Sequence, residues 1–186
     1  MIRCFVAISI PKTVAPQILA AQAGLPAGRP VPAENLHLTL AFLGEHPEPV
    51  VEDVHHALSE IRSPCMDVQL EGLDAFGNGR VRLVCIRAVL SENLARLNAS
   101  VKQAARLAGL NLPREKYVPH VTIARCGSKG ASGEDALKLR DFAARKAGFR
   151  ASFRAESFVL VRSYLGQSGP SYEDLAEYPL TWLQTS

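Results

Sequence analysis

The chain has 186 residues, 47% of them hydrophobic, and a formal net charge of +3. This length and composition favour a single globular domain over residues 1–186 with a substantial core. The small positive charge is compatible with an anionic ligand, but it is too weak for a protein that coats a nucleic-acid duplex. No apolar run approaches the length that crosses a bilayer. The first apolar segment is interrupted too soon by Pro11 for a signal peptide, so we expect a cytoplasmic protein with no membrane partner.

The cysteines are not spaced as metal ligands. The chain has four of them, Cys4, Cys65, Cys85 and Cys126. None belongs to a Cys-x-x-Cys pair, and no Cys/His cluster has zinc spacing. Three lie in apolar, strand-like runs, so we expect buried reduced thiols, a reducing compartment and no metal site.

Hydrophobic periodicity and turn residues divide the N-terminal half into alternating strands and helices. The expected elements in chain order are a strand over residues 2–10, a helix over 13–23, a strand over 36–43 and a helix over 48–61. Gly24 ends the first helix. The segment over 26–32 is rich in proline and glycine, which indicates a loop or an edge segment before the second strand.

Next comes a predicted hairpin, strands 66–76 and 80–90, whose link Gly77-Asn78-Gly79 tolerates the positive φ of a tight turn. The remaining expected elements are a helix over 92–108, a strand over 118–124, a helix over 134–147, a strand over 153–161, a glycine-rich connection over 164–172 and a strand over 175–183 in which Pro179 indicates a sheet edge. Hairpins without a long βαβ series favour an α+β fold with mostly antiparallel sheets.

Two of the predicted strands carry the same polar motif. One contains His37-Leu38-Thr39-Leu40 and the other His120-Val121-Thr122-Ile123. Side chains alternate along a strand, so the His and the Thr of each motif share one face and the two apolar residues share the other. The motifs are about half a chain apart, and such internal similarity is typical of a duplicated architecture. Two similar lobes facing each other would bring both polar faces to one cleft, a common place for a ligand.

Two histidines and two threonines can hydrolyse a phosphodiester without a metal ion. One imidazole can take a proton from the attacking oxygen while the other gives a proton to the leaving oxygen. The hydroxyls of Thr39 and Thr122 can stabilise the charge that develops on the phosphate oxygens. Residue chemistry alone does not say whether His37 or His120 is the acid. A single His in a strand is more often a core residue, and only the repetition favours function. His46, His55 and His56 are expected at a cap or in solvent.

With these two motifs the sequence resembles the 2H phosphoesterase superfamily, and most closely its RNA 2′,3′-cyclic phosphodiesterases, also called 2′-5′ RNA ligase-like proteins. The segments that carry the resemblance are Arg3-Cys4-Phe5-Val6-Ala7-Ile8, Glu34-Asn35-Leu36-His37-Leu38-Thr39-Leu40-Ala41-Phe42-Leu43-Gly44, Pro119-His120-Val121-Thr122-Ile123-Ala124-Arg125, Ser163-Tyr164-Leu165 and Gly169-Pro170-Ser171-Tyr172-Glu173-Asp174-Leu175. Members often have an aromatic residue shortly before the first motif, where this chain has Arg29-Pro30-Val31-Pro32.

The resemblance implies a bilobal, pseudo-twofold fold with two mostly antiparallel sheets flanking a central cleft and helices outside. It implies hydrolysis of RNA 2′,3′-cyclic phosphate ends to 2′-phosphomonoesters, with His37 as proton donor and His120 as proton acceptor. Thr39, Thr122 and Arg125 would bind the substrate phosphate. Strict alternation puts Arg125 on the face opposite His120, so Arg125 reaches the cleft only if the strand ends or bulges there. The alternative interpretation of Arg125 is a surface charge at the end of a strand. Phe5 and Phe42 could stack on a base, although core packing is the favoured interpretation of both.

The expected protein is thus a monomeric enzyme of one domain with two interleaved lobes, without cofactor or metal. Its partner would be RNA with a 2′,3′-cyclic phosphate end or a small cyclic nucleotide, and reversal of the reaction would give 2′-5′ ligation in vitro. Two alternatives stay open. The cleft could bind a nucleotide or RNA without turnover, or the substrate could be another small cyclic phosphate, such as an ADP-ribose derivative.

Overall fold

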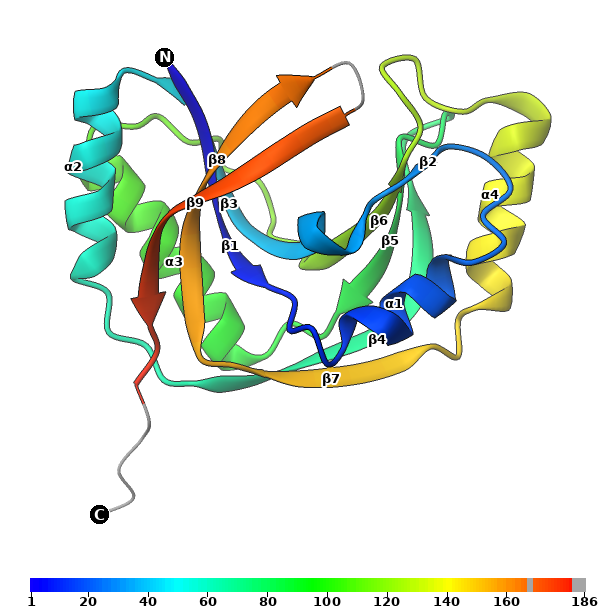
Figure 1. Cartoon of the computed structure of the whole chain (residues 1–186), viewed down its shortest axis with the longest axis horizontal. Helices are drawn as coiled ribbons and strands as arrows, with labels where there is room; N and C mark the ends of the chain where they lie inside the picture. Colours follow the sequence, from blue (N-terminus) through cyan, green and yellow to red (C-terminus); the bar gives the residue numbers. More distant parts are fainter. Residues whose placement is uncertain (167–168, 182–186) are drawn as a thin grey trace.

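The computed structural model describes residues 1–166 and 169–181 and has four α-helices around a curled antiparallel sheet (Figure 1). Its strands are β1 (Ile2–Ser9), β2 (Arg29–Pro30), β3 (His37–His46), β4 (Met66–Phe76), β5 (Leu83–Ala88), β6 (His120–Arg125), β7 (Arg150–Ala155), β8 (Ser157–Gly166) and β9 (Gly169–Pro179). Its helices are α1 (Ala15–Gln22), α2 (Glu48–Ser59), α3 (Glu92–Leu107), α4 (Gly133–Arg145) and the short 3-10 helix η1 (Ala33–Asn35).

The two strands that carry the His-Thr motifs lie in the middle of the sheet. The strand order is β7-β4-β5-β6-β3-β1-β8-β9, with β2 paired to β6 beside this path. Four strands therefore lie on each side of the junction between β6 and β3. The junction itself is narrow, because Leu38 and Val121 form the one residue pair recorded between these strands in the described part of the chain.

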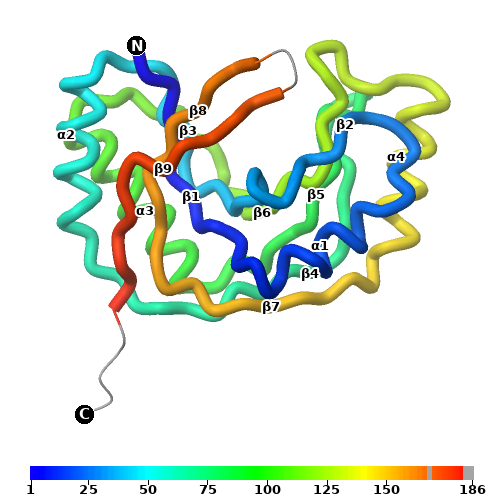
Figure 2. Tube along the Cα trace, in the orientation of Figure 1, coloured from blue at the N-terminus to red at the C-terminus, as the bar shows by residue number. Residues whose placement is uncertain are grey.

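The helices cover the outside of the two halves. Helices α2 and α3 pack against each other, and α3 packs against β3. On the other half α4 packs against β4, and α1 contacts β6. Figure 2 shows α2 and α4 at opposite ends of the molecule. Ser91 caps α3 by accepting a hydrogen bond from the main-chain N–H of Leu94, a common way to satisfy a free donor at a helix start.

Apolar side chains of the central strands fill the space beneath the helices. Leu38 and Leu40 of β3 and Val121 and Ile123 of β6 are fully buried or nearly so. The alternation predicted for both motifs is therefore correct, because the His and Thr residues between them are only partly buried and lie on the opposite face. The buried thiols are also confirmed for three of the four cysteines.

The α+β class, the antiparallel pairing and the helices on the outside are confirmed. The two expected sheets are the halves of one continuous sheet, because β3 and β6 are paired. The edge position predicted from Pro179 is also correct, since β9 ends the strand order. The part of the last expected strand beyond residue 181 lies outside the described residues. No helix in the described part of the chain is long and apolar enough to span a membrane.

Two predictions near the C-terminus are wrong. The single strand expected over 153–161 is two strands, because the extended chain changes partners at Glu156: β7 pairs with β4, whereas β8 pairs with β1 and β9. The connection expected over 164–172 consists mostly of the arms of the β8–β9 hairpin. The short strand β2 lies in the segment over 26–32, for which a loop or an edge segment was expected. Local patterns do not reveal which neighbour an extended segment pairs with, and that choice sets these boundaries.

Candidate active site

The two His-Thr motifs lie beside each other on adjacent antiparallel strands. Leu38 of β3 faces Val121 of β6. Facing residue numbers have a constant sum in an antiparallel pair, so His37 lies beside Thr122 and Thr39 lies beside His120. Residues opposite one another on neighbouring strands point to the same face of a sheet. All four polar side chains therefore line one surface, and each His has the Thr of the other motif as its cross-strand neighbour.

Both imidazole rings are held in the same way. The Nδ1 atom of His37 lies 2.7 Å from the carbonyl oxygen of Asn35, and Nδ1 of His120 lies 2.8 Å from the carbonyl oxygen of Val118. A carbonyl oxygen only accepts hydrogen bonds, so Nδ1 carries the proton and donates in each case. This leaves Nε2 of both rings for proton transfer with a ligand, and it fixes the orientation of each ring.

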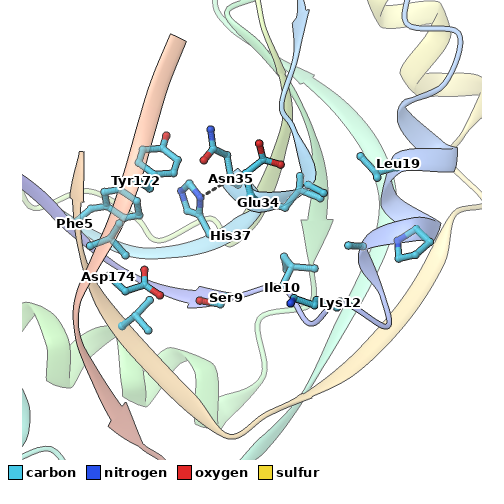
Figure 3. A pocket seen from close by; sticks show the side chains of 16 residues that line it. Phe5, Ser9, Ile10, Lys12, Leu19, Glu34, Asn35, His37, Tyr172 and Asp174 are labelled. Atoms are coloured by element: carbon cyan, nitrogen blue, oxygen red, sulfur yellow. Dashed lines mark hydrogen bonds between the residues drawn. The ribbon is translucent and has the colours of Figure 1, made fainter. Parts of the chain in front are cut away.

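His37 is the more enclosed of the two histidines. Its ring centroid lies 4.7 Å from that of Phe5 and 5.2 Å from that of Tyr172, which meets it edge-on (Figure 3). Burial lowers the pKa of His37 from 6.5 to about 4, and the positive charges of Arg125 and His120 lower it further, against the opposing effect of the hydrogen bond to Asn35. His37 is therefore neutral at pH 7 while the cleft is empty.

The aromatic neighbour of His120 is Phe76, which is less buried than the Phe5 ring beside His37. The ring of Phe76 meets the ring of His120 edge-on, with 5.3 Å between the two centroids. His120 and Thr39 line a cavity of about 380 Å³, together with Phe76 and Phe42. The two histidines thus line different cavities beside the shared surface and differ in how enclosed they are.

Arg125 reaches the face of the motifs through a bulge. The ladder between β5 and β6 shifts by one residue between Thr122 and Ala124, so Ile123 is an extra residue in β6. The extra residue reverses the alternation beyond it and turns Arg125 to the face of His120. Arg125 accordingly lines a cavity of about 420 Å³ together with Thr122 and the first histidine. The condition set by the sequence analysis, a bulge before Arg125 in β6, is therefore met.

A matching bulge lies in the first motif. The ladder between β1 and β3 shifts by one residue between Thr39 and Ala41, so Leu40 is an extra residue in β3. Phe42 then points to the face of His37, as Arg125 does in the other strand. Its side chain is 61% exposed, so the prediction that Phe42 packs in the core is wrong. The same prediction is correct for Phe5, which is buried.

Comparisons with known proteins agree with this geometry. Residues 10–167 match the model of the 2′-5′ RNA ligase superfamily. The chain belongs to that superfamily. It is 34% identical to a protein of Aeropyrum pernix named RNA 2′,3′-cyclic phosphodiesterase, over 84% of this chain and 88% of that one. It is 31% identical to an Escherichia coli protein of the same name, over 96% and 97%. A crystal structure of E. coli LigT complexed with 3′-AMP superposes with a TM-score of 0.81 at 28% identity, over 97% of this chain and 98% of that one.

Two polar side chains that the sequence did not single out for the site support it in this member of the superfamily. Asn35 uses its carbonyl oxygen to hold His37 and its side-chain amide to donate to the carbonyl oxygen of Pro170, 2.9 Å away. It thereby ties the first histidine to the β8–β9 hairpin, which carries Tyr172. The hydroxyl of Tyr117 donates to the carbonyl oxygen of Thr39 at 3.0 Å. The position of Asn35, two residues before His37, was the one signal in the sequence for these two residues.

Gln22, at the end of α1, clamps the bulge in β6. Its side-chain amide donates to the carbonyl oxygens of Val31 and Ile123, at 2.8 and 2.7 Å. Ile123 is the extra residue of the bulge, and its carbonyl oxygen also accepts from the main-chain N–H of Val31. One side chain thus joins a helix, the segment after β2 and the bulge that turns Arg125 toward the cleft.

The remaining histidines lie away from the two motifs. His46 contacts the carbonyl oxygen of Leu43, and His55 contacts the hydroxyl of Tyr178, on the outside of the sheet near α2. His55 and His56 are exposed, as predicted. Within residues 1–166 and 169–181, no three His, Cys, Asp or Glu side chains are grouped so as to hold a metal ion. A further cavity of about 620 Å³ adjoins His37 and is lined by Phe5, Lys12 and Asp174, among others (Figure 3).

Proposed function

We propose that this chain hydrolyses RNA 2′,3′-cyclic phosphate ends to 2′-phosphomonoesters by paired histidine catalysis. The observation that carries the proposal is the register of β3 and β6, which places both His-Thr motifs on one face with each His beside the Thr of the other motif. Relatives of about 30% identity over most of the chain, which are named RNA 2′,3′-cyclic phosphodiesterases, support the choice of substrate.

In the proposed reaction His120 is the proton acceptor. Its Nε2 atom takes a proton from a water molecule, whose oxygen attacks phosphorus. The bond from phosphorus to the 3′-oxygen breaks, and Nε2 of His37 gives its proton to that oxygen. The 2′-phosphomonoester and a free 3′-hydroxyl result. A proton must then return from His120 to His37, through solvent, before the next turnover.

The negative charge of the bound substrate would favour the protonated form of His37, which is the form that donates a proton. In the free protein the low pKa of His37 favours the neutral ring. A bound phosphodiester carries a negative charge, which offsets the repulsion from Arg125 and raises the pKa of the imidazole. Thr39, Thr122 and Arg125 would bind the non-bridging phosphate oxygens and stabilise the charge of the transition state. The two imidazoles perform both proton transfers, so the proposed reaction uses no metal ion and no cofactor.

The same site would also accept a nucleophile other than water, and the bond from phosphorus to the 3′-oxygen would break in the same way. A 5′-hydroxyl in place of water would give a 2′-5′ linkage, which we propose as an activity in vitro only. We further propose that residues 1–186 act as one domain of two interleaved lobes and as a monomer. The four free thiols support a reducing, cytoplasmic location.

The test uses an RNA oligonucleotide that ends in a 2′,3′-cyclic phosphate, with and without EDTA, and identifies the product by ³¹P NMR. The expected product is the 2′-phosphomonoester, at the same rate in both samples. An RNA that stays cyclic, while calorimetry shows that it binds, would support the binding-module alternative. A panel of small cyclic phosphates in the same assay tests the alternative substrates.

A further inference from the structure

Two arginines face each other across a short ladder at the edge of the site. Arg29 of β2 is the cross-strand partner of Arg125 of β6. Like charges directly opposite one another destabilise a strand pair. No carboxylate among the described residues forms an ion pair with either guanidinium. The fold thus holds two positive charges close together without a direct ion pair to either among the described residues, although Glu34 lines the same cavity.

The backbone builds this pair into the fold. A Cβ atom at Gly28, whose φ is +87°, would lie 3.1 Å from the carbonyl oxygen of Arg125, so the chain before Arg29 approaches β6 as closely as only glycine allows. On the other side of Arg29, the amide of Gln22 clamps Val31 to β6. The short strand is fixed at both ends, which keeps Arg29 opposite Arg125.

Both arginines line the cavity of about 420 Å³ that contains His37 and Thr122. Another wall of that cavity is formed by the start of β9, with Gly169 and Ser171. The guanidinium of Arg29 crosses to that wall, because its Nη1 atom lies 3.5 Å from the position that a Cβ of Gly169 would occupy. Arg29 therefore lies at the exposed rim of the cavity, where its guanidinium is accessible to a ligand.

We propose that Arg29 and Arg125 form a subsite for a second phosphate, namely the phosphodiester that precedes the cyclic phosphate in an RNA chain. Guanidinium groups bind phosphate with paired, charge-assisted hydrogen bonds, and one phosphate offsets the repulsion between the two arginines. This inference rests on the proposed function, since the cyclic phosphate must lie between the histidines. Arg125 borders both phosphates, whereas Arg29 serves the second one only. The site therefore selects the end of an RNA chain over a nucleoside cyclic phosphate.

The test compares the wild-type protein with Arg29→Gln on three substrates of the same base: a nucleoside 2′,3′-cyclic phosphate, the same compound with a 5′-phosphate, and a dinucleotide with a 2′,3′-cyclic end. We expect Arg29→Gln to lower kcat/KM on the dinucleotide on the order of tenfold, through KM, and to leave the nucleoside substrate unchanged. The 5′-phosphate substrate tells whether a terminal phosphate occupies the subsite as well as an internal phosphodiester. Arg106→Gln, which removes the same charge from an exposed position on α3, is the matched control.

Calorimetry with the corresponding 2′-phosphate products, with and without the second phosphate, repeats the comparison without turnover. An equal effect of Arg29→Gln on all three substrates, or no effect on any, overturns the subsite and leaves the proposed function in place. A wild-type protein that hydrolyses none of the substrates overturns the proposed function. In that case, affinity for the second phosphate that depends on Arg29 would still support the subsite.

Discussion

Phe42 and Arg125 occupy the same position in two repeated strands. Each is the fifth residue after the histidine of its motif, and each follows a bulge that turns it to the cleft face. The repeat therefore extends over six residues, His-x-Thr-x-Ala followed by Phe in one strand and Arg in the other. One half of the site thus offers an apolar ring and the other a fixed positive charge at equivalent places.

Phe42 should matter for binding and little for stability. Its ring is 61% exposed, so Phe42→Ala removes little buried surface, and we expect the free energy of unfolding to change by less than about 1 kcal/mol. If the ring stacks on a base, the same substitution raises KM several-fold, while Phe42→Trp retains the affinity. Steady-state kinetics and urea unfolding of the three proteins measure both effects. A large loss of stability with unchanged KM would mean that Phe42 acts in packing only.

Arg125 should control the protonation of the first histidine. Burial is the main cause that lowers the pKa of His37 to about 4, and the positive charge of Arg125 adds to the effect. Arg125→Met should therefore raise that pKa toward 6.5, whereas Arg125→Lys, which keeps the charge, should leave it low. NMR titration of the imidazole in the free protein measures the shift.

The two Arg125 variants also test the role in catalysis. Loss of one donor to the phosphate should reduce kcat/KM of Arg125→Met on the order of 10². A His37 pKa that stays near 4 in Arg125→Met would show that Arg125 does not contribute to it, and Arg106→Met controls for the loss of one positive charge elsewhere.

Gln22 should stabilise the fold and the position of Arg125 together. Gln22→Leu keeps a similar size but removes the donor to the carbonyl oxygens of Val31 and Ile123. Among the described residues, the carbonyl oxygen of Val31 then has no recorded hydrogen-bond partner. We expect a loss of roughly 1–3 kcal/mol in the free energy of unfolding. Activity should fall as well in a Gln22→Leu protein that remains folded, because the bulge in β6 loses its hydrogen bond from the Gln22 amide. Unchanged stability and activity would assign no role to this amide. Gln103→Leu, on α3, is the control.

The sequence predicts the parts of the site that depend on local alternation. The pattern of His37 and Thr39, and its repeat in β6, sufficed to place four polar side chains on one face and their neighbours in the core. The pattern did not predict that Phe42 is exposed on the face of His37, nor which strands pair with β7 and β8. Bulges and strand partners depend on segments that are distant in the chain. The same holds for Gln22, whose amide contacts Ile123 across 101 residues. Such contacts carry no periodicity, so pattern alone does not reveal them.

The most direct test of paired histidine catalysis compares His37→Ala and His120→Ala on two cyclic substrates, one with the 3′-oxygen and one with sulfur in its place. We expect each variant to lose 10²- to 10⁴-fold in kcat on the oxygen substrate while keeping the wild-type circular dichroism spectrum. Sulfur leaves as a thiolate without needing a proton, so the sulfur substrate should restore turnover in His37→Ala and not in His120→Ala. Restoration in His120→Ala instead would reverse the two roles, and wild-type kcat in either variant on the oxygen substrate would contradict paired histidine catalysis.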